Sequence, residues 1–325
     1  MGGLISVIIA CVGFWSSLVF YNSYLPEIAA PEDRDRISAK GFMMGYIGSV
    51  LLQLICFVFV FVPSLVGGDD STTIQFRICF LLVGLWWFGF SQIPFRVLPS
   101  NTASNKKPKK HILINGFHEL KLVWNQVDQI PALKRYLAAF FFLSVGVQTV
   151  MLVAAGYSKK NIFPKPEDEP KLILTILLIQ VVAIFGAIAM SKLSKKIGNI
   201  PTMLVGIVIW VAICIWGYFI TSQTEFYILA ACVGLVMGGI QSIGRSTYSK
   251  LLPATTETTS FFSFYDVTEK IALTIGLFLF AYNEELTGSM RNSILVLMVF
   301  FIISFFALLY TKAVITREKY ASLFH

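Results

Sequence analysis

The chain has 325 residues, of which 56% are hydrophobic and only 14% are charged, with a formal net charge of +8 and a mean hydropathy of +0.73. A soluble chain carries about a quarter charged residues. The composition therefore excludes a soluble globular protein, and it also excludes a disordered chain, a collagen-like repeat and a disulfide-rich secreted module. An all-α polytopic membrane protein remains.

Nine apolar runs are long enough to cross the hydrocarbon core of a bilayer, which takes about 20 residues. All nine are expected to be helices, because an open strand cannot satisfy its backbone hydrogen bonds in lipid. The predicted spans are 4–21, 41–62, 77–95, 136–157, 172–190, 201–220, 226–244, 263–282 and 294–311.

The Lys and Arg residues between these spans are unevenly distributed. If the loop after the first span is cytoplasmic, 20 of them fall on the cytoplasmic side and 6 on the other. The excess of positive charge on cytoplasmic loops then places the N-terminus outside and the C-terminus in the cytoplasm. The same bias explains the net charge, so no nucleic-acid partner is expected.

The only long connection runs from residue 96 to residue 135 and is predicted to be a cytoplasmic loop. It contains the basic tract KKPKK at 106–110 and then apolar residues at three- and four-residue steps: Phe117, Leu120, Trp124, Val127 and Ile130. This spacing predicts an amphipathic helix at the headgroup level of the membrane. We expect the loop to rest on anionic lipid, and a regulatory or partner-binding role stays open.

Three spans precede this loop and six follow it. The first span ends in Tyr21-x-x-x-Leu25-Pro26, and the seventh, six spans later, ends in Tyr248-x-x-x-Leu252-Pro253. Such an echo is typical of parallel six-span repeats. We expect residues 1–95 to be the remainder of an N-terminal half, 96–135 the central loop and 136–325 a C-terminal six-helix half, which together correspond to spans four to twelve of twelve.

The segment 261–282 carries three ionisable residues inside a predicted span. Its uninterrupted apolar part, 271–282, would reach only about 18 Å as a helix, so the span must extend back through Lys270, Glu269 and Asp266. The i,i+3 and i,i+4 spacing puts these side chains on one face. They form either a stabilising ion pair of Asp266 with Lys270, or a substrate or proton-coupling site in which Glu269 titrates.

Other polar residues inside the spans are candidates for lining a cavity, with bonding between helices as the alternative. Arg245 could close the site, bind an anionic group or extend to the membrane surface. The remaining candidates are Gln241, Tyr265, Gln148, Thr149, Gln180 and Gln53.

Small residues predict close helix packing in two spans. They are Gly41, Gly45 and Gly48 in the second span, and Gly234, Gly238 and Gly239 in the seventh.

No pattern for a metal site, a cofactor or a catalytic nucleophile is found. The five cysteines all lie in apolar runs without C-x-x-C spacing, and the three histidines lie outside every run. We therefore expect no enzyme activity, no metal and no cofactor.

Several segments together resemble the vacuole-effluxer-like family of the major facilitator superfamily. They are FYNSYLPEIA at 20–29, SAKGFMMGYIGS at 38–49, VGVQT at 145–149, GLVMGGIQSIGRSTYSKLLP at 234–253 and FFSFYDVTEK at 261–270. This family includes the autophagy-related vacuolar amino-acid exporters of fungi and many bacterial relatives. The resemblance implies a secondary transporter that exports small solutes such as amino acids, with protons as a possible coupling ion.

The chain departs from the family in three places, and one of them is Val145, where family members often carry an acidic residue immediately before Gly146. The family's opening span, with its Tyr-Asp-Trp-Ala-Asn signature, has no counterpart, so the first three spans are expected to be absent. In the turn at 191–201, Lys195 stands where the superfamily has Asp, and Asn199 stands where it has a basic residue. We thus expect this turn to lack its charge pair between helices.

Our leading hypothesis is an alternating-access transporter of the bacterial inner membrane. The alternative is a truncated, non-transporting membrane protein or an incomplete gene product.

Overall fold

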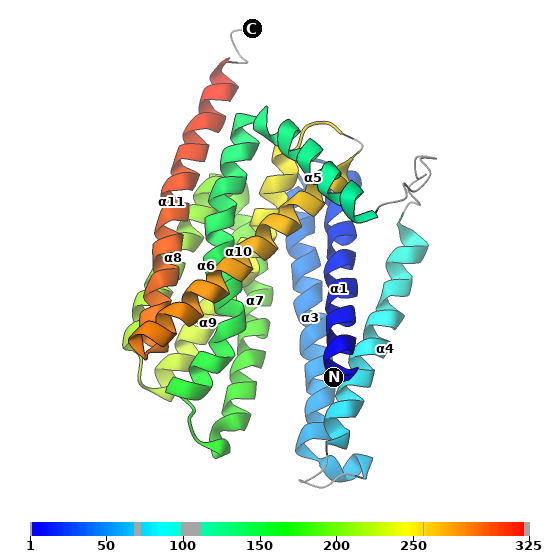
Figure 1. Ribbon diagram of the computed structural model, residues 1–325, viewed down its shortest axis with the longest axis vertical. Coiled ribbons are helices and arrows are strands. Elements are labelled where there is room, and N and C mark those ends of the chain that lie inside the picture. The colour runs from blue at the N-terminus through cyan, green and yellow to red at the C-terminus, as the bar shows by residue number, and fades with distance from the viewer. Residues whose placement is uncertain (1, 68–72, 99–111, 256, 322–325) are drawn as a thin grey trace.

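The computed structural model describes residues 2–67, 73–98, 112–255 and 257–321, and these form a bundle of long helices (Figure 1). The helices are α1 (Gly2–Ser23), α2 (Leu25–Ile28), α3 (Arg34–Phe61), α4 (Ile74–Val97), α5 (Ile112–Asp128), α6 (Pro131–Asn161), α7 (Glu169–Ile197), α8 (Asn199–Phe219), α9 (Gln223–Leu251), α10 (Thr258–Thr287) and α11 (Met290–Ala321). Two 3-10 turns, η1 (Pro63–Val66) and η2 (Pro166–Asp168), complete the elements.

Eight stretches of the described chain are long and apolar enough to cross a membrane. They correspond to all of the predicted spans except 263–282, which lies in α10. That helix has 30 residues and runs obliquely from the end of the bundle near α5 to the start of α11 (Figure 1). It is as long as the other spans, but Asp266, Glu269 and Lys270 interrupt its apolar sequence, as the span-length argument anticipated.

The expected amphipathic helix is α5, and it lies across one end of the bundle, which we call the α5 end (Figure 1). The C-terminal part of α11 extends past this end, whereas α1 starts toward the opposite one. Val123 and Val127 of α5 are buried, and the helix packs on α6 and α10. Part of the apolar face thus covers protein instead of lipid, although Phe117 stays 76% exposed. The basic tract at 106–110 lies outside the described residues.

The densest core lies among α6 to α11. Its buried side chains include Trp210 of α8 and Phe301 of α11, whose rings stack at 5.3 Å. By contrast, α4 packs on α3 and η1, and its outward side chains, such as Phe80 and Phe88, are 76% and 71% exposed. A helix with an apolar exposed face suits a lipid environment, because lipid tails offer no hydrogen-bond partners to polar side chains.

The tightest helix contact joins α7 to α9, and glycines make it possible. A Cβ atom added at Gly234 or Gly238 would overlap the backbone carbonyl of Ile179 or Ala183 on α7, and one at Gly239 would overlap the side chain of Met190. Packing without side chains lets the two backbones approach closely. In the second predicted span, a Cβ at Gly48 would come 3.8 Å from Trp86, and one at Gly45 would meet no described atom within 4 Å.

These contacts predict different effects for two glycine-to-alanine changes. Gly238→Ala should destabilise the protein by about 1–3 kcal/mol, because the methyl group meets backbone that cannot turn away. Gly45→Ala, the matched control in another span, should be neutral or stabilising by up to about 1 kcal/mol. Thermal unfolding of the two variants in detergent measures the difference, and equal melting temperatures would contradict the packing.

Candidate functional site

Arg245 of α9 is buried at the α5 end and joins α9 to the first helices of the chain. It is only 4% exposed. Its guanidinium donates to the hydroxyl and the carbonyl of Ser38 on α3, both at 3.0 Å, and to Oδ1 of Asn22 on α1 at 2.9 Å. The rings of Tyr21 and Phe42 lie 5.1 and 4.6 Å from the guanidinium carbon. Arg245 is therefore a buried junction of three helices, and its described hydrogen-bond and ring partners are all neutral.

Gly41 of α3 allows this junction to form. A Cβ at this position would overlap the hydroxyl of Tyr21 and come 3.1 Å from a guanidinium nitrogen of Arg245. The first of the predicted packing glycines thus makes room for a buried polar contact, as well as for a neighbouring helix.

A second group at the α5 end, the Asp35 cluster, consists of Asp35, Ser194, Asn199 and Lys250. The carboxylate of Asp35 on α3 accepts from Nζ of Lys250 at 2.6 Å, from Nδ2 of Asn199 at 2.7 Å and from the hydroxyl of Ser194 at 3.2 Å. Gly198, with φ +90°, forms the tight turn between α7 and α8 that starts α8 at Asn199. Only glycine adopts such a φ without strain.

Beside the 191–201 turn there is a charge pair between helices, but neither of its charged members belongs to the turn. The carboxylate comes from α3 and the cation from the end of α9, with Asn199 of the turn between them. Sequence spacing within the turn does not reveal this pairing, because its charged members are 215 residues apart.

The three ionisable residues of α10 lie together, and we call Asp266, Glu269 and Lys270 the α10 cluster. Nζ of Lys270 lies 3.3 Å from Oε1 of Glu269 and 3.7 Å from Oδ1 of Asp266. It also lies 3.5 Å from the ring centroid of Trp15 on α1. The side chains of Asp266, Glu269 and Lys270 are 14%, 17% and 26% exposed, respectively, so the cluster is largely but not completely buried.

The four predicted glutamines, Gln148, Gln241, Gln180 and Gln53, form hydrogen bonds between neighbouring helices. Nε2 of Gln148 on α6 donates to Oε1 of Glu269 at 2.5 Å, which adds α6 to the α10 cluster. Between α3 and α9, the hydroxyl of Tyr46 donates to Gln241 at 2.9 Å. Between α3 and α7, Gln180 donates to Gln53 at 2.6 Å. Hydrogen bonds thus join α3 to α7 and α9 and join α6 to α10.

Two candidates lie in packed surroundings instead. Tyr265 is 4% exposed, and its ring stacks between Phe140 at 4.4 Å and Tyr248 at 4.7 Å. Thr149 is fully buried against Gly276 of α10, and its hydroxyl has no hydrogen-bond partner among the described residues. Among the described residues, neither side chain is hydrogen-bonded to the α10 cluster.

Sequence reasoning missed Trp15, Asn22 and Asp35. Trp15 lies in an unbroken apolar run, where nothing in a single sequence distinguishes it from a lipid-facing tryptophan. Asn22 lies within the segment FYNSYLPEIA, and Asp35 lies among the basic residues that were used only for sidedness. Both of these were visible as polar residues at a span end.

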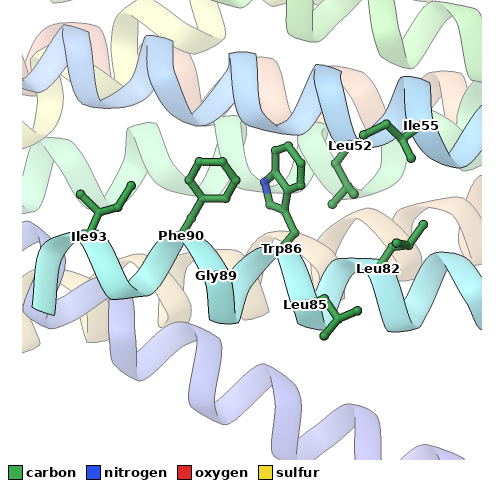
Figure 2. A pocket seen from close by; sticks show the side chains of 8 residues that line it. All are labelled: Leu52, Ile55, Leu82, Leu85, Trp86, Gly89, Phe90 and Ile93. Atoms are coloured by element: carbon green, nitrogen blue, oxygen red, sulfur yellow. The ribbon is translucent and has the colours of Figure 1, made fainter.

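A groove of about 420 Å³ between α3 and α4 has a different chemistry (Figure 2). It is lined by Leu52, Ile55, Leu82, Leu85, Trp86, Gly89, Phe90 and Ile93. No ionisable side chain lines it, so it suits hydrocarbon and is not the polar candidate site.

Solved structures with a similar fold are membrane transporters. The E. coli fucose:proton symporter FucP aligns with 90% of this chain and 72% of its own at a TM-score of 0.62 and 14% identity. A bacterial homologue of the iron transporter ferroportin aligns with 89% of this chain and 66% of its own at a TM-score of 0.52 and 14% identity. The fold is therefore the helical bundle of the major facilitator superfamily.

Sequence comparison gives the particular family. The sequence model of the family described as "Vacuole effluxer Atg22 like" matches residues 1–319, and the chain belongs to this family of integral membrane proteins. The uncharacterized MFS-type transporter YxiO of Bacillus subtilis is 29% identical over 295 residues, which cover 91% of this chain and 67% of YxiO.

Autophagy-related protein 22-1 of Penicillium rubens is 28% identical over 263 residues, which cover 72% of this chain and 42% of that protein. The chain thus spans about two thirds of the length of YxiO and less than half that of the fungal relative.

The Asp35 cluster predicts a stability effect that an exposed pair does not share. Asp35→Asn should lower the free energy of unfolding by about 1–3 kcal/mol, because Lys250 loses its charged acceptor in a largely buried position. Asp33, two residues earlier, pairs with Arg36 in an exposed position, so Asp33→Asn should change stability by less than about 0.5 kcal/mol. Thermal unfolding in detergent compares them, and an equally silent Asp35→Asn would show that the cluster contributes nothing to stability.

Proposed function

We propose that the protein is a secondary active transporter that works by alternating access and exports small solutes, such as amino acids, with protons as the coupling ion. Membership of a transporter family and the major facilitator fold support transport. The neighbours in sequence and structure are transporters and not enzymes.

The observation that carries this proposal is the α10 cluster with its partners Gln148 and Trp15. An ionisable group at membrane depth costs several kcal/mol unless it is paired or hydrated. Three such groups, partly exposed and in contact with side chains from α1 and α6, are more than helix packing requires. A site for solute and proton between the helices accounts for them.

The contacts at the α5 end fit one state of an alternating-access cycle. Arg245 and the Asp35 cluster hold α1 and α3 against α7, α8 and α9 there. To open this end, the protein must break hydrogen bonds that are replaceable by water. Residues 1–95 and 136–325 would then move as the two halves of the transporter, with 96–135 as their connection.

We further propose that the protein lies in a bacterial inner membrane with its N-terminus outside and its α5 end in the cytoplasm. The distribution of Lys and Arg supports this orientation. The basic tract at 106–110 and the exposed Phe117 of α5 would then contact anionic lipid.

The proposal predicts distinct effects for the two carboxylates of the α10 cluster. Glu269→Gln should shift the pH dependence of transport while leaving membrane abundance nearly unchanged, because a titratable group is replaced by a near-isostere. Asp266→Asn should also lower abundance, because Lys270 loses one of its two carboxylates in a buried position. Solute flux in vesicles between pH 5 and pH 8 measures the first effect, and immunoblotting of membranes measures the second.

A matched control lies on the same helix. Glu284 pairs with Lys160 in a more exposed position near the end of α10, so Glu284→Gln should leave the pH profile unchanged. If Glu269→Gln and Asp266→Asn keep the original flux at every pH, the α10 cluster is structural and the coupling site lies elsewhere.

The orientation is tested separately with a reporter enzyme that is active only in the cytoplasm. Fusions after Lys110 or Lys319 should be active, and fusions after Lys165 or Gly288 should be inactive, because the charge bias places these positions on opposite sides. Reporter activity in whole cells is the measurement. An active fusion at Lys165 would reverse the orientation.

A further inference from the structure

We propose that Trp15, Asp266 and Glu269 form a binding site for a primary ammonium group of the solute, and that the ammonium group of Lys270 occupies this site in the present structure as a built-in substitute. This inference rests on the proposed function and names the chemical class of the solute.

The contacts of Lys270 show what the site recognises. Its ammonium group lies 3.5 Å from the centroid of the Trp15 ring, 3.3 Å from Glu269 and 3.7 Å from Asp266. An aromatic face together with carboxylates is the arrangement that attracts an organic cation, since the ring quadrupole and the negative charges act in the same direction. The cation present is itself a primary ammonium, so the geometry already fits one.

The charge of the site leaves room for a second cation. With all three groups ionised, Asp266, Glu269 and Lys270 carry one excess negative charge, and the neighbouring Gln148 contributes a neutral amide. A metal ion is a poor match, because no group of three His, Cys, Asp or Glu residues lies together among the described residues. A quaternary ammonium has no N–H group that could donate a hydrogen bond to the carboxylates.

Lys270 can leave the site when another ammonium group replaces it. Its side chain is flexible and 26% exposed, and its two carboxylate partners lie on its own helix, whereas Trp15 belongs to α1. When a solute ammonium takes over the contacts with Trp15 and the carboxylates, Lys270 turns toward water. The link between α1 and α10 then passes through the solute.

The position of Lys270 inside the predicted span 263–282 favours a solute over a lipid headgroup. Lys270 is 12 residues after the start of α10 at Thr258, which corresponds to about 18 Å along the helix. Ethanolamine headgroups also carry a primary ammonium, but they lie at the membrane surface.

Chemical rescue tests the site directly in the full chain. Lys270→Ala removes three methylene groups and the ammonium, and propylammonium restores these atoms. At ten times its dissociation constant, propylammonium should raise the melting temperature of the variant in detergent by about 2 °C. The unaltered chain should respond less, because Lys270 competes.

Three controls separate ammonium binding from general stabilisation. Propanol, which has the same shape without the charge, should not rescue. Lys160→Ala, which removes the partner of Glu284, should not respond to propylammonium. The double variant Trp15→Ala/Lys270→Ala should lose the rescue, because the ring face is gone. In lipid nanodiscs, stabilisation of Lys270→Ala by phosphatidylethanolamine without propylammonium would assign the site to a lipid headgroup and overturn the proposal that it binds a solute.

Equal shifts for propylammonium and propanol, or no shift with either, would overturn the proposal. If Lys270→Ala is not recovered folded, its recovery becomes the measurement: propylammonium in the solubilisation buffer should restore a monodisperse protein, and failure with both compounds rejects the site. These outcomes do not depend on solute flux. If propylammonium fails to rescue Lys270→Ala while Glu269→Gln still shifts the pH dependence of transport, the ammonium site is rejected and the proposed transport function is retained.

Discussion

The cost of placing charge in hydrocarbon governs this structure. Each ionisable group within the bundle is energetically acceptable only with partners or water, and the described structure supplies partners from distant parts of the chain. Lys270 has two carboxylates and a tryptophan ring. Arg245 has hydrogen-bond acceptors on two other helices and two aromatic faces. The positions of α1 and α3 against α9 and α10 follow in part from these requirements.

Two kinds of helix contact differ in what they permit. The contact of α7 with α9 is made by glycines against backbone carbonyls, and such packing fixes the spacing of two helices. The contacts of α3 with α7 and α9 include hydrogen bonds such as Gln180 to Gln53 and Tyr46 to Gln241. Because water or a solute can replace a hydrogen bond, a polar boundary can separate and close again, whereas a glycine contact keeps its geometry. This contrast favours movement at the boundary of α3 over movement within the α7–α9 pair.

The Arg245 junction and the α10 cluster share one helix, α1. Near its end, α1 gives Asn22 and Tyr21 to Arg245 of α9, and seven residues before Asn22 it gives Trp15 to Lys270 of α10. Both contacts therefore lie on a single helix of 22 residues. In the proposed cycle, this helix would connect occupation of the ammonium site to the opening of the α5 end.

The helical class, eight of the nine predicted spans and the charged face of α10 were predictable from the sequence, because hydrocarbon thickness and the cost of buried charge act on local composition. The repeat spacing and motifs also indicated the superfamily. Only the tertiary structure decided the partners: Asp35 with Lys250 across 215 residues, Trp15 with Lys270, and Thr149 against Gly276. The reason is physical. Composition determines that a charge in lipid needs a partner, but helix packing decides which of several polar or aromatic side chains comes within reach.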